Sequence, residues 1–254
     1  MLFDTSTLAE LCSEARKRAG QGWRLVEAQH HVATLKLADD LDDQAILEGL
    51  IEATKEHVPR ECAHLHYLLY TPFRYVLYPH GSRYRRAGFT PGVFYAAEQV
   101  ETAAAEAAFY RLLFFAESPG TPWPVNPLSL TAFRFAYAHD RVLDLFTPAF
   151  APHRAALTRL ADYEPTQRLA DAARSAAVGV IRYPSVRDPD GGANLALFTC
   201  LAFAASQPDE QQTWHVQLNA HGVHCLCETT RARLSFRPDA FAADIRLAGM
   251  RWTR

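Results

Sequence analysis

The chain has 254 residues, of which 49% are hydrophobic and 21% are charged, and its formal net charge is −2. These values are typical of a globular protein that buries a sizeable core, as one large domain or one domain with an appendage. A near-neutral charge gives no overall attraction to nucleic acid or to an anionic membrane, so both classes of partner are disfavoured.

The ends and the cysteines of the chain indicate a cytoplasmic protein. The N-terminal residues lack a basic region followed by an apolar stretch, so no signal peptide is predicted. No apolar run is long enough to span a bilayer. The five cysteines are odd in number and scattered, which favours reduced thiols over a disulfide framework.

Residues 1–60 are predicted to form a helical extension. Thr5-Ser-Thr7 can cap a first helix that ends near Gly20, a second helix is predicted over Trp23–Leu37, and a third follows the acidic run Asp39–Asp43. No set of residues in this segment points to catalysis. We therefore expect it to pack on the main domain or to form a partner or dimer surface.

Residues 61–254 are predicted to form an α+β domain with a mixed or antiparallel sheet and inserted helices. The predicted strands are rich in aromatic and β-branched residues and are separated by turn residues. They cover 65–78, 92–97, 134–137, 142–146, 178–183, 194–203, 214–218 and 231–236. The predicted helices cover 102–116, 151–161 and 165–175.

The most informative residue is Glu106, which lies in a helical segment, Thr102–Ala116, that is otherwise apolar nearly all round. Such a helix is normally buried, and an unpaired buried carboxylate is costly. Because proteins keep such groups mainly where they do chemistry, Glu106 is the first candidate catalytic residue. The alternative is a Glu that reaches solvent or forms a structural ion pair.

Several arginines at the start of the domain are candidate binders of phosphate. Arg74 lies between aromatic residues, and Arg83, Arg85 and Arg86 cluster in a loop with two glycines. A guanidinium group binds two phosphate oxygens at once, and glycine lets the backbone approach the ligand. The alternative is a solvated basic loop.

Two polar residues flank a Gly-rich turn. Ser185 ends a predicted strand and Asn194 opens the next one, so they are candidates to bind a ligand or to hold the loop. Nothing around Ser185 resembles a nucleophile elbow, so we do not interpret it as a nucleophile.

Motifs for other kinds of site are absent. The ligand-type residues within Cys62–His66 and His221–Cys227 do not have the spacing of a zinc site, so no metal is predicted. The sequence also contains no Walker loop and no Gly-x-Gly-x-x-Gly fingerprint.

Taken in order and spacing, the motifs resemble the RES domain, the toxin component of bacterial toxin–antitoxin pairs whose antitoxin carries a helix-turn-helix-type domain. The resemblance runs from about Arg74 to Phe236 and includes the Gly/Arg loop, Gly92–Ala97, Thr102–Glu106, Tyr163–Ala170, Gly179–Ser185 and Asn194–Phe198. The family is named for Arg, Glu and Ser, which map here to Arg74, Glu106 and Ser185.

One departure from the family pattern concerns the loop arginine. The usual Gly-Gly-Arg-Trp-like loop is replaced by Gly81-Ser-Arg-Tyr-Arg-Arg-Ala-Gly88, so the equivalent arginine is Arg83 or Arg86. Arg86 is favoured because it lies nearer to Tyr95.

The resemblance implies a fold like that of ADP-ribosyltransferases and an activity that consumes NAD. Arg74 and the loop arginines would hold the NAD pyrophosphate, and Tyr95 would stack on the nicotinamide or its ribose. Glu106 would bind the ribose hydroxyls and stabilise the oxocarbenium-like centre as the C–N bond breaks. Ser185 and Asn194 would orient the nicotinamide ribose or amide.

The resulting functional hypothesis is a cytoplasmic toxin that cleaves the nicotinamide–ribose bond of NAD by hydrolysis or phosphorolysis, without a metal. A protein ADP-ribosyltransferase and a catalytically inactive partner-binding module are the alternatives. The resemblance also implies a helix-turn-helix antitoxin that covers the NAD cleft in a multimeric complex. The expected organisation is a helical extension over residues 1–60 and a RES domain over 61–254.

Overall fold

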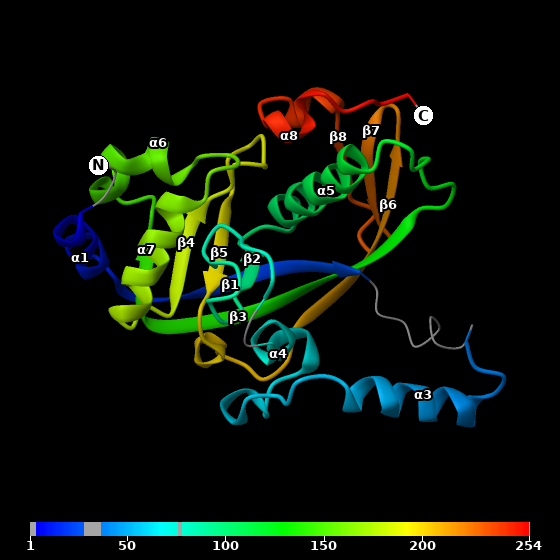
Figure 1. Ribbon diagram of the computed structural model, residues 1–254, viewed down its shortest axis with the longest axis horizontal. Coiled ribbons are helices and arrows are strands. Elements are labelled where there is room, and N and C mark those ends of the chain that lie inside the picture. Colours follow the sequence, from blue (N-terminus) through cyan, green and yellow to red (C-terminus); the bar gives the residue numbers. More distant parts are fainter. Residues whose placement is uncertain (1–3, 28–36, 76–77, 254) are drawn as a thin grey trace.

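The computed structural model describes residues 4–27, 37–75 and 78–253 (Figure 1). Its strands are β1 (Arg16–Glu27), β2 (Phe94–Ala97), β3 (Leu128–Asp144), β4 (Val180–Pro184), β5 (Ala193–Leu197), β6 (Glu210–Asn219), β7 (Gly222–Cys227) and β8 (Arg233–Phe236). Its α-helices are α1 (Thr5–Ser13), α3 (Leu41–Ala53), α4 (Tyr67–Arg74), α5 (Val100–Glu117), α6 (Arg154–Leu157), α7 (Glu164–Ser175) and α8 (Ile245–Ala248). The predicted α+β class is confirmed.

Within the described residues, the strands form one sheet in the order β1-β2-β5-β4-β3-β6-β7-β8. Strand β1 also pairs with β3, so that β1, β2, β5, β4 and β3 close into a ring. The pairing of β3 with β4 is parallel and the other pairings are antiparallel, which makes the sheet mixed, as predicted.

The core has three parts, each centred on a different helix. Helix α5 packs Phe109 and Leu112 against the part of the sheet that contains β6 and β7. Helix α7 packs Leu169 with residues of β4 and α1, and α4 packs Leu69 with β2 and β5. Figure 1 shows α5 beside β6 and β7, and α7 beside β4, so the two helices flank the strands β2 and β5 from different sides.

The segment predicted as a second helix is instead strand β1, as far as residue 27. It runs antiparallel to β3, with Gly22 opposite Phe135 and Trp23 opposite Arg134. The Phe135 ring lies where a Cβ on residue 22 would be, so glycine gives this aromatic side chain room inside the sheet. Residues 28–36, which complete the predicted helix, lie outside the described residues. Helix α1 begins at Thr5 as predicted, but it ends at Ser13, and the residues from Arg16 to Gly20 belong instead to strand β1. The helix predicted after the acidic run is confirmed as α3.

The segment predicted as a strand over 65–78 contains helix α4. His66 caps this helix, since its Nδ1 atom accepts a hydrogen bond from the Leu68 amide at 3.3 Å. The buried residues Leu68, Leu69 and Pro72 lie on one face at helical spacing. The prediction was wrong because it relied on the aromatic and branched composition, which is a weak indicator of strand.

The prediction that all cysteines are reduced thiols is also wrong in this structure. Cys62 and Cys200 form a disulfide across 138 residues and join the segment before α4 to the segment after β5, whereas Cys12, Cys225 and Cys227 are free and buried.

Among the helices that the structure describes, none is long and apolar enough to cross a membrane.

Candidate active site

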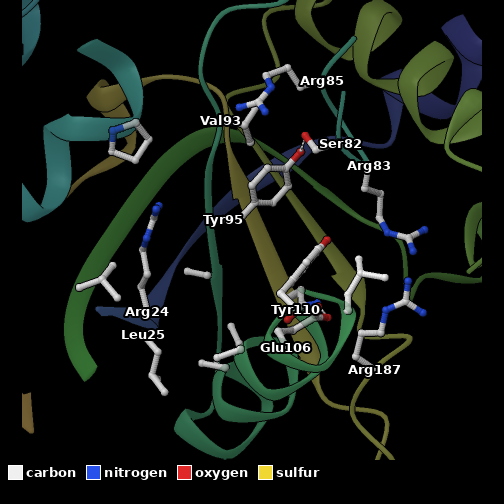
Figure 2. Close-up of a pocket in the computed structure, with 18 of the residues that line it drawn as sticks. Arg24, Leu25, Ser82, Arg83, Arg85, Val93, Tyr95, Glu106, Tyr110 and Arg187 are labelled. Atoms are coloured by element: carbon white, nitrogen blue, oxygen red, sulfur yellow. Dashed lines mark hydrogen bonds between the residues drawn. The ribbon is translucent and has the colours of Figure 1, made fainter. Parts of the chain in front are cut away.

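A cleft of about 1050 Å³ lies between α5 and the loop that leads into β2. Strand β1 contributes Trp23–Glu27 to its wall, the loop contributes His80–Arg83 and Arg85, and β2 contributes Tyr95–Ala97. Figure 2 shows Glu106 and Tyr110 on α5, with Arg24 on one side of the cleft and Arg83 and Arg187 on the other.

Glu106 is placed in this cleft because only part of α5 is buried. Ala105, Ala108 and Phe109 pack into the core, while Glu106 is half-buried and lines the cleft. Tyr110, one helical turn later, is 53% exposed. The expected helix that is buried all round is therefore replaced by one with an open side, and this open side carries the carboxylate.

Two side chains from the neighbouring strands hold the Glu106 carboxylate. The Ser185 hydroxyl donates to Glu106 Oε1 at 2.7 Å, and Asn194 Nδ2 donates to the same oxygen at 2.5 Å. Both donors are buried, at 7% and 3% exposure. Strands β4 and β5 are antiparallel and pair Tyr183 with Asn194, which brings Ser185, just after β4, close to Asn194. The structure thus brings together three of the residues predicted from the sequence.

The turn that carries Ser185 is itself held in place. Ser185 Oγ accepts hydrogen bonds from the amides of Arg187 at 3.2 Å and Asp188 at 3.0 Å, so its proton is directed to Glu106. Asp188 Oδ2 accepts from Thr102 Oγ1 at 2.7 Å and from the Gly192 amide at 3.1 Å. The turn is thereby attached to the first part of α5, the helix that carries Glu106.

Arg24, on β1, lies in the wall of the cleft, and no carboxylate of the described residues forms an ion pair with it. Its Nη1 atom is buried and makes no hydrogen bond, and its guanidinium lies 4.6 Å from the centroid of the Phe94 ring. Burial lowers the pKa of Arg24 to about 10, so the group stays charged at neutral pH. A buried guanidinium nitrogen without a hydrogen bond is costly, and an anionic ligand in the cleft could satisfy it.

Tyr95 lies in the cleft with its hydroxyl fixed. The hydroxyl forms a hydrogen bond with Ser82 Oγ at 2.8 Å (Figure 2). It also accepts one from the Tyr84 amide at 3.0 Å. Burial raises the pKa of this hydroxyl, so Tyr95 remains neutral. Its ring is held rigidly against the cleft and can stack on a planar ligand.

The structure does not bring Arg74 into the cleft. Arg74 is buried at the end of α4, where its Nη1 atom contacts Glu52 of α3 at 2.7 Å and its Nε atom donates to the Glu56 carbonyl. These contacts give Arg74 the geometry of a structural link between α3 and α4. This position does not support the predicted role of Arg74 at the site, which stays a prediction.

The two loop arginines are separated. Arg83 lines the cleft, whereas Arg86 pairs with Asp171 at 2.7 Å and borders a different surface depression. The preference for Arg86 is therefore not supported by its position. Both Nη atoms of Arg83 donate to backbone carbonyls, of Leu157 at 3.1 Å and Arg159 at 3.0 Å.

Sequence reasoning missed four residues that line the cleft: Arg24, Tyr163, Arg187 and Arg246. Arg24 was overlooked because its segment was predicted to be helix, which hides the alternation of a strand. Arg187 follows the Ser185 motif by two residues, and this spacing was an available signal. Nothing in the sequence pattern connects Arg246 with Ser185 or Glu106, because only the folded chain places α8 beside the cleft. Among the described residues, no group of three or more metal-ligating side chains could hold an ion.

Three comparisons with known proteins place this geometry in context. No curated protein sequence matches the chain. A solved structure that is similar to it is the crystal structure of the M. tuberculosis MbcT–MbcA toxin–antitoxin complex, with 13% identity, a TM-score of 0.45 and coverage of 96% of this chain and 98% of that chain. The family model of the RES domain matches residues 58–219. Because this match spans well over half of the 254 residues, the chain belongs to the RES domain family.

Proposed function

We propose that this protein is the toxin of a bacterial toxin–antitoxin pair and consumes NAD by cleaving the bond between nicotinamide and ribose. The observation that carries the proposal is the Glu106 carboxylate, which Ser185 and Asn194 orient in a cleft whose opposite wall holds Arg24, with its Nη1 atom buried and without a hydrogen bond. A carboxylate held in a fixed position stabilises a positively charged centre, and a guanidinium group binds an anion. NAD presents both features, a cationic nicotinamide ribose and a pyrophosphate.

In this proposal, Glu106 stabilises the oxocarbenium-like ribose as the C–N bond breaks and nicotinamide leaves with the bonding electrons. The carboxylate is already oriented before the reaction, which is the condition under which electrostatic stabilisation is most effective. Ser185 and Asn194 hold it, and both of their bonds fall on Oε1, so Oε2 remains available to the ribose hydroxyls.

The remaining residues bind the rest of the molecule. Arg24, in place of Arg74, pairs with the pyrophosphate. A guanidinium group can donate to two phosphate oxygens at once, and the buried Nη1 atom of Arg24 then gains a hydrogen bond. Tyr95 offers its fixed ring to the nicotinamide or the adjacent ribose. NAD is a substrate here, and its ADP-ribose part passes to water, as in a glycohydrolase, or to phosphate, as in a phosphorylase.

The partner in this proposal is a cognate helix-turn-helix antitoxin that covers the cleft, in a cytoplasmic complex of several subunits. The family resemblance supports this part of the proposal. Deletion of residues 1–60 cannot test it, because β1 pairs with β3 and carries Arg24. A direct test is whether a purified cognate antitoxin inhibits NAD cleavage by preventing NAD from binding in the cleft that contains Arg24 and Glu106.

The activity is tested by incubating the purified, partner-free chain with NAD, with and without inorganic phosphate, and identifying the products by mass spectrometry. Nicotinamide with ADP-ribose indicates a glycohydrolase, and ADP-ribose 1″-phosphate that forms only with phosphate indicates a phosphorylase. Glu106→Ala is the control variant. A folded wild-type protein that releases no nicotinamide would overturn NAD cleavage in favour of a partner-binding module, and ADP-ribosylated protein as the main product would favour the transferase alternative.

A further inference from the structure

A second cluster of charged side chains borders the cleft on the side away from Arg24. Arg187 and Arg246 each donate from Nη2 to the carbonyl of Leu160, at 2.6 and 3.0 Å. Arg83 donates to two more carbonyls of the same loop. Three guanidinium groups from separate parts of the chain thus hold the segment that leads into Tyr163.

The C-terminal segment organises this cluster. Asp244 is only 2% exposed and lies 2.8 Å from Arg187 Nη1 and 2.8 Å from Arg246 Nη2. Asp244 thus pairs with two of the three arginines, so the cluster of Arg83, Arg187, Arg246 and Asp244 carries a net positive charge. Asp244 and Arg246 lie beyond residue 219, where the match to the RES domain ends.

Tyr163 is the side chain around which these cations gather. The Arg83 guanidinium lies 5.0 Å from the centroid of the Tyr163 ring, and Arg246 and Arg187 interact with the Tyr163 hydroxyl. Tyr110 interacts with both Tyr163 and Glu106, so it lies between the cluster and the catalytic carboxylate. Figure 2 shows Tyr110 next to Glu106, with the guanidinium groups of Arg83 and Arg187 turned toward each other.

These surroundings shift the pKa values of Tyr163 and Tyr110 in opposite directions. Burial alone would raise the pKa of Tyr163, but the positive charges of Arg246, Arg83 and Arg187 outweigh it and lower the pKa below the ordinary value. Although 53% of Tyr110 is exposed, burial of its hydroxyl group, together with Tyr163 and Glu106, raises the pKa of Tyr110. Tyr110 therefore keeps its proton, and Tyr163 is the first of the pair to ionise.

We propose that Tyr163 is the general base that takes the proton of the attacking water, and that Arg246 and Asp244 are positioning residues for it. This proposal rests on the proposed NAD cleavage. The C–N bond breaks and its electron pair leaves with nicotinamide, which becomes neutral; the water oxygen bonds to the ribose carbon, and its proton passes to the Tyr163 phenolate, which becomes a phenol. Glu106 stabilises the ribose cation throughout this step and keeps its own charge.

The ionisation is tested without substrate, by ultraviolet titration of tyrosinate in the full chain. One tyrosine should ionise below the ordinary value of about 10, and this component should be absent from Tyr163→Phe. Arg246→Met should move it to higher pH, and Arg246→Lys should move it back toward the wild-type position. The matched control is Tyr67→Phe, since Tyr67 is 43% exposed on α4 and lies outside the cluster. A low component that persists in Tyr163→Phe overturns the proposal.

The catalytic role is tested by pH–rate profiles of NAD hydrolysis without phosphate. Tyr163→Phe should lose about 10²- to 10⁴-fold in kcat, with KM changed far less, and should lose the acid limb of the profile. Asp244→Asn removes an anion from the cluster and should shift the acid limb to lower pH. Arg246→Met removes a cation and should shift the limb to higher pH, so the two variants are distinguishable. Unchanged kcat in a folded Tyr163→Phe overturns this step alone, whereas a wild-type chain that cleaves no NAD overturns the step and the proposed function together.

Discussion

Ser185 and Glu106 are 79 residues apart in the chain and are joined by a hydrogen bond of 2.7 Å from Oγ to Oε1. The serine cannot swing away easily, because its oxygen also accepts two backbone hydrogen bonds from the following turn. The serine is therefore a residue that orients the carboxylate, and its position agrees with a binding role and not with that of a nucleophile.

The first prediction concerns the charge of Glu106. Glu106→Gln keeps the size of the side chain and removes the charge that opposes the ribose cation, so NAD cleavage should fall by about two to four orders of magnitude. The matched control is Glu101→Gln on the same helix, because Glu101 is exposed and lies outside the cleft. Initial rates and circular dichroism of both variants check this prediction, and a folded Glu106→Gln with full activity would contradict it.

The second prediction concerns orientation rather than charge. Ser185→Ala removes one of two hydrogen bonds to the carboxylate, and a hydrogen bond to a charged group contributes about 1.5–3 kcal/mol, so kcat/KM should fall by about 10- to 100-fold. In Glu106→Gln the same serine substitution should have a smaller effect, because the two residues act together. Equal effects in both backgrounds would show that Ser185 acts independently of Glu106.

The third prediction separates the two arginines that compete for the role of pyrophosphate ligand. Arg24→Met should lower kcat/KM for NAD by about 10- to 100-fold and leave Tm unchanged or higher, because it removes a guanidinium whose Nη1 atom is buried and makes no hydrogen bond. Arg74→Met should instead destabilise the fold by about 1–3 kcal/mol, because it breaks the link between α3 and α4. Steady-state kinetics and thermal melts of both variants decide, and the reversed pattern would restore Arg74 to the site.

The contrast between these arginines shows how far the sequence alone could reach. Glu106, Ser185 and Asn194 were found because each stands in a local motif, and the antiparallel pairing of β4 and β5 then brings the last two together. The position of Arg24 depends on the pairing of β1 with β3, a contact between segments more than 100 residues apart. Local propensity cannot predict such a pairing, and in this chain it favoured helix for the segment.

The fold was predictable to a similar extent. Helix α7, which has Pro165 in its first turn, and strands β2 and β4 were placed correctly. The aromatic residues of α4 instead led to the prediction of a strand. The buried face of α4 packs beside the Cys62–Cys200 disulfide. Both the pairing of these cysteines and the packing of the helix are set by tertiary contacts, which spacing along the chain does not report.

The fourth prediction concerns that disulfide. Under denaturing, non-reducing conditions, a thiol reagent should titrate three cysteines of the five, and all five after reduction. Because the bridge closes a loop of 138 residues, reduction should lower stability by about 2–5 kcal/mol. Five reactive thiols in protein purified without reductant would instead agree with the reduced state expected from composition.

The fifth prediction concerns the turn that connects Ser185 to α5. A Cβ on residue 192 would overlap Thr102 Oγ1 and Asp188 Oδ2, the two atoms whose hydrogen bond ties the turn to the helix. Gly192→Ala should therefore displace the turn, weaken the Ser185–Glu106 bond and lower both Tm and NAD cleavage. The matched control is Gly49→Ala on α3, where a Cβ meets nothing within 4 Å. Because alanine is the better helix former, that variant should gain about 0.5–1 kcal/mol with unchanged activity. If Gly192→Ala left both the melt and the rate unchanged, the turn would not be the element that positions the carboxylate.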